Sequence, residues 1–362
     1  MKITLTPDIL DELLAVNEEA ETADYILNEG YFALSEEELS VAVKAMGKGE
    51  APSSAYRRAL LPLLDQEAKE MLASVQVGYG LDEIKALDAG GYQENPYYKK
   101  VCSIVNKKTK IGDWTLEMKS YMPYQLFVYD EVVPSCPYAS YSPIGFFKAA
   151  FPYPALSQKG TTYMSLIPHE MNTMAEPIQK ARGRVLTMGL GMGYFAFMAS
   201  QKDEVASVTV LERDPSVVSL FKKAFLPLFD HPEKIEIKLM DDALLFEAKE
   251  PYDYLFADLH HDAVDGLPLY IRLLRKKGLA QEIDVWIEKA ILEYMRRHVI
   301  ALIGEEFDGS VDADYESAET FSDSLLRALH FHLKNYELSN QEQLAHLLSD
   351  ETLRSIAETL KI

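Results

Sequence analysis

Cysteine is scarce in this sequence of 362 residues, and features that mark export or a membrane are missing from it. The two cysteines, Cys102 and Cys136, are too few for a disulfide framework or a cysteine-rich metal site. No run of about 18 consecutive apolar residues occurs, so no transmembrane helix is expected. The N-terminal residues lack the basic stretch and apolar run of a signal peptide. We therefore expect a cytoplasmic protein with no membrane partner and no metal.

Basic residues are also few: 36 Lys and Arg face 57 Asp and Glu, which gives a net charge of −21. Because a phosphate backbone is held by clustered basic side chains, nucleic acid is not an expected partner. The acidic excess favours solubility and is compatible with a small neutral or cationic substrate. Hydrophobic residues make up 48% of the chain, which excludes wholesale disorder. A homo-oligomer is compatible with these numbers.

Composition and periodicity divide the chain into four regions. Residues 1–78 predict a helical module, and residues 79–160 a β-hairpin followed by a connection rich in aromatic residues and proline. Residues 161–305 alternate short apolar strands with helices, which is typical of a parallel α/β sheet. Residues 306–362 predict an acidic linker and a helical tail. The expected strands of the third region are 184–188, 208–211, 235–239, 252–257 and, as a possible fifth, 282–287.

Several local signals refine this division. Ser35 with Glu38 forms a capping box, and Pro62 should interrupt a helical stretch over 54–75. Ser322 and Ser339 are expected helix caps in the tail. In the second region, residues 114–118 and 125–129 predict the two strands of the hairpin. The aromatic segment after it is either the wall of a pocket or, as we favour, a connection that packs its rings on a neighbouring domain.

Three alternate glycines follow the first strand of the third region and precede a helix. Gly189, Gly191 and Gly193 allow a ligand to approach the backbone closely, and a helix N-terminus favours a carboxylate or phosphate. The strand–turn–helix context is the one that nucleotide-binding folds use. The alternative is a tight turn that binds nothing.

Acidic residues follow the next three strands. Glu212 ends the second strand, 21 positions after Gly191, where a carboxylate can accept hydrogen bonds from both hydroxyls of a ribose. The alternative is that Glu212 is an exposed acid at a strand end. Asp242, followed by Ala243, is placed to accept a hydrogen bond from the exocyclic amine of adenine. Asp258 follows the fourth strand, where a dehydrogenase would more often keep an uncharged edge beside its nicotinamide. The pattern therefore favours S-adenosylmethionine over a nicotinamide dinucleotide.

With these motifs in place, residues 184–258 resemble a class I S-adenosylmethionine-dependent methyltransferase of the Rossmann-like type. The glycine turn matches the first motif of that family, Glu212 its ribose-binding acid, and the Asp242-Ala243 pair its adenine side. The resemblance implies a sheet with helices on both faces and S-adenosylmethionine as cofactor. The sequence departs from the family at two places. Thr187 occupies a position where many members carry an acid. Residues 289–303 have helical spacing, so the final antiparallel strands of the family are not predicted here.

Within that fold the sequence is most similar to the spermidine-synthase-like proteins. Pro168-His169-Glu170 lies where those proteins carry an acid upstream of the first strand, which implies that Glu170 contacts the cofactor. The alternative is that His169 and Glu170 cap a helix that continues to Ala181. After Asp258, however, the chain has Leu-His-His-Asp where the aminopropyltransferases have Asp-Ser-Ser-Asp. We expect His260 and His261 to be solvent-facing loop residues rather than metal ligands.

The function expected from these residues is S-adenosylmethionine-dependent methyl transfer to a small molecule. Such a reaction depends chiefly on alignment of the two substrates, and Asp258 is placed to orient the acceptor or to remove its proton. A structural role for Asp258 is the alternative. Three other functions stay open: an aminopropyltransferase, a catalytically silent nucleotide-binding or interaction module, and, least favoured, a dehydrogenase.

Overall fold

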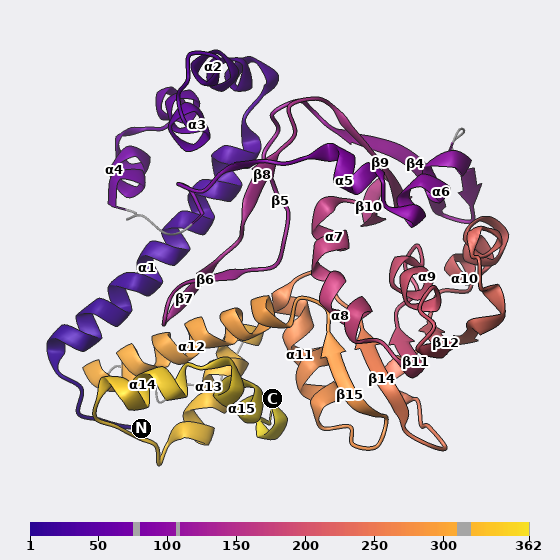
Figure 1. Ribbon diagram of the computed structural model, residues 1–362. Coiled ribbons are helices and arrows are strands. Elements are labelled where there is room, and N and C mark those ends of the chain that lie inside the picture. The colour runs from indigo at the N-terminus through magenta and orange to yellow at the C-terminus, as the bar shows by residue number, and fades with distance from the viewer. Residues whose placement is uncertain (75–79, 106–108, 310–319, 362) are drawn as a thin grey trace.

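Five parallel strands form the central sheet of the computed structural model, which describes residues 1–74, 80–105, 109–309 and 320–361 (Figure 1). Their order in the sheet is β13-β12-β11-β14-β15, so the chain starts in the middle, moves to one edge and then crosses to the other. This is the doubly wound arrangement, and the predicted Rossmann-like fold class is confirmed. The strands are β11 (Gly183–Met188), β12 (Val205–Glu212), β13 (Ile235–Leu239), β14 (Tyr252–Ala257) and β15 (Ala280–Val285).

Each face of this sheet packs against its own set of helices. Leu186 and Met188 are buried in a core shared with α11 (Ala263–Leu274) and α12 (Glu288–Asp308). Val185, which points to the opposite face, is buried with aromatic side chains from α9 (Tyr194–Ser200) and its neighbours. Because successive side chains of a strand point to opposite faces, the near-continuous apolar run of β11 is explained by burial on both sides.

The N-terminal segment packs against the C-terminal region of the chain. β1 (Lys2–Ile3) pairs in parallel with β16 (Glu337–Leu338), and α1 (Pro7–Glu29) lies along α12. The carboxylate of Asp24 accepts from the guanidinium of Arg297 at 2.6 Å, which joins these two helices. The C-terminal helices complete this core, and they are α13 (Phe321–Leu333), α14 (Gln341–Leu347) and α15 (Asp350–Thr359).

The helical signals of the first 74 residues are confirmed. Ser35 and Glu38 form the predicted capping box at the start of α2 (Glu36–Met46). The stretch around Pro62 is broken into α3 (Pro52–Leu60), the short 3₁₀ turn η2 (Leu61–Leu63) and α4 (Gln66–Ser74). The expected end of this stretch at Val75 lies outside the described residues.

Two predicted helix caps of the tail are wrong by one or two positions. Thr320 rather than Ser322 caps α13, in a capping box with Asp323. Asn340 rather than Ser339 caps α14. In both cases a neighbouring residue forms the cap in place of the predicted serine. Serine, threonine and asparagine side chains all accept a hydrogen bond from the first turn of a helix, so the sequence alone does not select among them. Most of the predicted acidic linker, residues 310–319, lies outside the described part of the chain.

The hairpin predicted over 114–118 and 125–129 is wrong, although both segments contain strands. β4 (Trp114–Tyr121) pairs with β9 (Phe151–Gln158) in a four-stranded antiparallel sheet, whereas β5 (Phe127–Val128) pairs with β8 (Ile144–Phe146) in a separate three-stranded sheet. Three hairpins do occur in the described part of this region: β3 (Thr109–Ile111) pairs with β4, β6 (Val133–Cys136) with β7 (Ala139–Tyr141), and β9 with β10 (Thr161–Ser165). The two-residue turn between β9 and β10, Lys159-Gly160, has positive φ at both positions (51° and 91°), the conformation that twisted strands favour.

Helix α10 (Pro215–Leu220) lies between β12 and β13. Further elements lie between α4 and β11. They are β2 (Lys85–Ala86), α5 (Ala89–Gln93), α6 (Pro96–Ile104), β3 (Thr109–Ile111), β6 (Val133–Cys136), β7 (Ala139–Tyr141), α7 (Pro168–Thr173) and α8 (Ala175–Lys180). In the parts of the chain that the structure describes, no helix is both long and apolar enough to cross a bilayer.

Candidate functional site

The carboxyl ends of four neighbouring strands lie side by side. The ladder continues one residue past the strands, since Gly189 donates to the carbonyl of Leu211 at 2.9 Å and Asp258 to that of Met188 at 2.8 Å. On the other side, Met240 donates to the carbonyl of Glu212 at 2.8 Å. Residues that follow β11, β12, β13 and β14 are thereby brought to one edge, as the sequence predicts for parallel strands.

The three glycines of the turn after β11 all have positive φ, but they have different neighbours. A Cβ on Gly189 would lie 2.0 Å from the carbonyl oxygen of Asp258, and one on Gly193 would lie 2.3 Å from the ring of Phe221. These two glycines are required by the packing of the chain itself. A Cβ on Gly191 would meet only the sulfur of Met164, at 3.7 Å. Gly191 is therefore the position of this turn at which the backbone is open enough for a ligand to approach it.

The carboxylate of Glu212 lies beside this turn. Its Oε2 accepts from the backbone N–H of Leu190 at 3.1 Å, and its Oε1 accepts from that of Asp214 at 2.8 Å. The residue is 9% exposed, so Glu212 is not the exposed strand-end acid of the alternative interpretation. A carboxylate has about four lone-pair sites. Two backbone partners therefore fix its position and leave capacity for further donors such as ribose hydroxyls.

Two further carboxyl groups extend from Glu212: Asp258 lies within electrostatic range of Glu212, and Glu170 lies within electrostatic range of Asp258. Burial raises the pKa of Asp258 to about 7, and the charge of Glu212 adds to the shift. Burial also raises the pKa of Glu170, in the first turn of α7, to about 8, and the charge of Asp258 adds to it. Both groups hold a proton far more readily than isolated carboxyls do. The three acids Glu212, Asp258 and Glu170 thus form an acidic edge that a cation would stabilise.

A network of hydrogen bonds holds α7 against the sheet. The indole N–H of Trp286, which follows β15, donates to the hydroxyl of Thr173 at 2.9 Å. That hydroxyl in turn donates to the carbonyl of His169 at 2.8 Å. The helix turn that carries Glu170 is consequently tied to the end of β15.

Asp242 already has partners for both of its carboxylate oxygens. Its Oδ1 accepts from the backbone N–H of Leu244 at 2.9 Å, and its Oδ2 accepts from Arg272 at 3.1 Å. The hydrogen bond from Leu244 lowers the pKa of the Asp242 carboxyl, which favours its ionised form. Asp242 thereby caps the short 3₁₀ turn η6 (Ala243–Leu245), in which Ala243 is buried. The adenine contact expected of Asp242 and Ala243 stays a prediction.

The two histidines after Asp258 have different environments. His261 is exposed, with its ring 5.4 Å from that of Tyr163, as expected. His260 is only 6% exposed, and its Nε2 lies 2.9 Å from the carbonyl of Trp286, so the expectation of a solvent-facing His260 is wrong. It packs against Gly266 of α11, where there is no side chain to exclude its ring. Among the described residues, no group of three or more potential ligands is arranged to hold a metal ion.

Residues that support the site from the N-terminal part of the chain were not predicted. Tyr97, fully buried on α6, donates through its hydroxyl to the carbonyl of Met192 inside the glycine turn. The indole of Trp114 on β4 donates to Asp214 at 2.9 Å, next to the loop that holds Glu212. These contacts join segments about a hundred residues apart, and no local pattern reveals them. Asn95-Pro96 signals only the start of a helix.

No protein family and no curated protein matched this sequence in the comparisons. Solved structures did match over part of the chain, at low similarity. Spermidine synthase from Thermotoga maritima is 17% identical with a TM-score of 0.30, over 41% of this chain and 55% of that one. A dimethyladenosine transferase from Plasmodium falciparum is 20% identical with a TM-score of 0.26, over 34% and 42%. A putative O-methyltransferase from Klebsiella pneumoniae is 20% identical with a TM-score of 0.21, over 28% and 46%.

The chain therefore spans about half the length of these solved structures. The fold assignment itself depends on the order and direction of the five strands.

Proposed function

We propose that this chain is an S-adenosylmethionine-dependent methyltransferase that acts on a small molecule. One arrangement carries the proposal: Glu212 is held by Leu190 beside the open backbone of Gly191, and Asp258 and Glu170 extend the acidic edge from there. Ribose hydroxyls are donors that suit the free lone pairs of Glu212. A cationic group next to the adenosine suits the other two acids.

The same edge disfavours a dinucleotide. A pyrophosphate would bring negative charge toward Glu212, Asp258 and Glu170, and neither Asp258 nor Glu170 gains a cationic partner from the described residues. The helix after the glycine turn, α9, is only seven residues long and offers a short dipole for an anion. S-Adenosylmethionine, by contrast, brings a sulfonium.

When bound, S-adenosylmethionine supplies a methyl group on a positively charged sulfur. The contribution of the chain is alignment: Glu212 fixes the ribose end, and the acids of the edge face the cationic end. Because the pKa of Asp258 is raised to about 7, a substantial fraction of this carboxyl is ionised at neutral pH and can accept a proton from the acceptor. Asp258 is the residue that we assign to this role.

A second candidate is aminopropyl transfer from decarboxylated S-adenosylmethionine. That molecule lacks the carboxylate of S-adenosylmethionine, so its net positive charge is higher by one. The accumulation of three acids at one edge is the observation that favours it. The chain lacks the Asp-Ser-Ser-Asp segment of the aminopropyltransferases after Asp258, which is why we place methyl transfer first.

The nucleoside product separates the two reactions. The protein is incubated with S-adenosylmethionine, or with the decarboxylated form, and a mixed library of small amines, hydroxyls and thiols. Formation of S-adenosylhomocysteine supports methyl transfer, and formation of methylthioadenosine supports aminopropyl transfer. Asp258→Asn should reduce turnover by at least about a hundredfold, while Asp203→Asn, at an exposed turn, should leave it unchanged. Cofactor binding without any nucleoside product would favour the silent binding module.

A further inference from the structure

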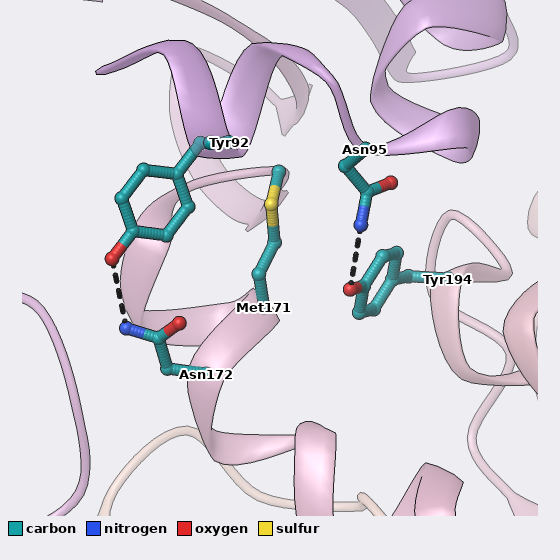
Figure 2. A pocket seen from close by; sticks show the side chains of 6 residues that line it. Tyr92, Asn95, Met171, Asn172 and Tyr194 are labelled. Atoms are coloured by element: carbon teal, nitrogen blue, oxygen red, sulfur yellow. Dashed lines mark hydrogen bonds between the residues drawn. The ribbon is translucent and has the colours of Figure 1, made fainter. Parts of the chain in front are cut away.

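A cavity of about 290 Å³ lies beside the acidic edge, between the helices before β3 and the start of α9. Its walls come from three segments, the α5–α6 region, α7 and α9, and Figure 2 shows how the side chains are turned. The lining residues are Gly91, Tyr92, Asn95, Met171, Asn172 and Tyr194. Met171 directly follows Glu170, and Tyr194 directly follows Gly193. The cavity is thus a neighbour of the site described above.

Two asparagine–tyrosine pairs face each other across this cavity, with Met171 between them (Figure 2). The side-chain amide of Asn95 donates to the hydroxyl of Tyr194 at 3.0 Å, and that of Asn172 donates to the hydroxyl of Tyr92 at 3.0 Å. Since each phenol oxygen accepts from an amide, its own hydrogen is left to donate elsewhere.

The direction of both pairs is fixed by further contacts. The side-chain oxygen Oδ1 of Asn95 accepts from the backbone N–H groups of Tyr97 and Tyr98 at 3.0 and 3.1 Å. The side-chain nitrogen of Asn95 must therefore be the atom that faces Tyr194. The amide nitrogen of Asn172 also donates to the carbonyl of Tyr129 at 2.7 Å. The side-chain oxygen of Asn172 is turned away from Tyr92 (Figure 2), and no hydrogen bond from the described residues reaches it.

Both phenols stay protonated at physiological pH. Burial raises the pKa of Tyr194 to about 12, and burial also raises the pKa of Tyr92. The cavity therefore offers two O–H donors, from Tyr92 and Tyr194, and one free acceptor, from Asn172. Met171 adds an apolar, polarizable surface against which a flat ring packs well.

The charge of the ligand follows from the lining. None of the six residues is a lysine, arginine, aspartate or glutamate, so neither an anion nor a cation finds a charged partner there. A planar carboxamide or lactam is complementary to these groups, because its carbonyl can accept from a phenol O–H and its N–H can donate to Asn172.

We propose that this cavity binds the acceptor substrate through an uncharged carboxamide or lactam group on a planar ring. That it is the acceptor end rests on the proposed function; the preference for a carboxamide rests only on the cavity. Tyr92 and Tyr194 are the specificity-determining residues, and Asn95 and Asn172 orient them.

Three probes that share one ring test the proposal: benzamide, benzoate and benzylamine. Their dissociation constants are measured at pH 7 by ligand-observed saturation-transfer NMR on the wild type, Tyr92→Phe, Tyr194→Phe and the double variant. Benzamide should bind at least about tenfold more tightly than either charged probe. Each single phenylalanine substitution should raise the dissociation constant of benzamide by about fivefold, the effect of losing one neutral hydrogen bond. Tyr25→Phe, at a tyrosine that is 54% exposed, is the matched control.

Calorimetric titration of S-adenosylhomocysteine into the same variants keeps this test separate from the proposed function. The phenylalanine variants should bind it as the wild type does, which also shows that they are folded. Benzamide binding without S-adenosylhomocysteine binding would leave the cavity assignment standing and remove the proposed function. No benzamide binding, equal binding of benzoate or benzylamine, or unchanged benzamide binding in the double variant would overturn the inference.

Discussion

The backbone N–H of Leu190 donates to Oε2 of Glu212 across 3.1 Å, which joins the glycine turn after β11 to the end of β12. The other carboxylate oxygen of Glu212 accepts from Asp214 at 2.8 Å. Glu212 thus has a structural role in addition to the proposed ribose contact. Variants of this residue must be judged by stability and by binding separately.

Glu212→Gln should lower the free energy of unfolding by about 1–3 kcal/mol. The amide replaces one acceptor oxygen by an NH₂ donor, which faces a backbone N–H that then has no acceptor. Urea unfolding followed by circular dichroism measures the difference. Glu236→Gln, an exposed position on the neighbouring β13, should change the free energy by less than about 0.5 kcal/mol. Equal stability of the two variants would contradict the assigned hydrogen bonds.

Gly191→Ala and Gly193→Ala should separate binding from packing. At Gly193 the new methyl lies 2.3 Å from the ring of Phe221, which is fully buried, so stability should fall by about 3 kcal/mol or more. At Gly191 the cost is that of the left-handed backbone alone, about 1–2 kcal/mol. Thermal unfolding checks both values.

The folded Gly191→Ala variant should nevertheless bind S-adenosylhomocysteine at least about tenfold more weakly, because its methyl group occupies the open side of the turn. Unchanged binding would show that no ligand approaches the backbone at this position.

Stability should fall as the pH rises from about 4 to about 8. The pKa values of Asp258 and Glu170 are raised to about 7 and about 8 in the folded chain, well above those of unfolded carboxyl groups. Between these limits the folded state binds more protons than the unfolded state, so raising the pH favours unfolding. This contribution is fully present below the unfolded pKa values and lost once the pH passes the folded ones.

Glu170→Gln removes one of these titrations. Between pH 5 and pH 9 the stability of the variant relative to the wild type should rise by about 4 kcal/mol, because the wild type loses over this range the stability that the protonated Glu170 provides. Urea unfolding over that pH range gives the difference, with the exposed Glu247→Gln as control. A difference that stays constant with pH would mean that Glu170 titrates normally.

Binding of S-adenosylmethionine should tighten as the pH rises from 6 to 9, by about tenfold. Ionisation of Asp258 and Glu170 adds negative charge that attracts the sulfonium, and the ligand in turn lowers their pKa values. S-Adenosylhomocysteine has no sulfonium and should show a much smaller change. Parallel pH profiles for the two ligands would argue against a cation facing the acidic edge.

The sheet was predictable from the sequence because its signals are local. Each strand of the core is a short apolar run bounded by turn residues, and burial on both faces leaves that run nearly unbroken in β11 and β14. The carboxyl ends of parallel strands necessarily share one edge, so Glu212 and Asp258 were expected near the glycine turn.

Features that depend on contacts between distant parts of the chain were not predicted. Alternation identified β4 and β5 as strands, but the partners β9 and β8 are set by distant pairing. His260 is polar and follows a strand end, yet a glycine of α11 leaves room to bury it. Tyr97 and Trp114 contact the site across about a hundred residues of chain. The turn at Lys159-Gly160 did carry a signal, a glycine after a polar residue between two alternating segments, that identifies the hairpin of β9 and β10.

Calorimetric titration of S-adenosylhomocysteine and of NAD into the wild type, Glu212→Gln and Glu236→Gln tests the adenosine site most directly. We predict that S-adenosylhomocysteine binds the wild type and Glu236→Gln equally, that NAD binds none of the three, and that Glu212→Gln binds S-adenosylhomocysteine at least about tenfold more weakly. Unchanged affinity in a folded Glu212→Gln protein, or tighter binding of NAD than of S-adenosylhomocysteine, would contradict the account.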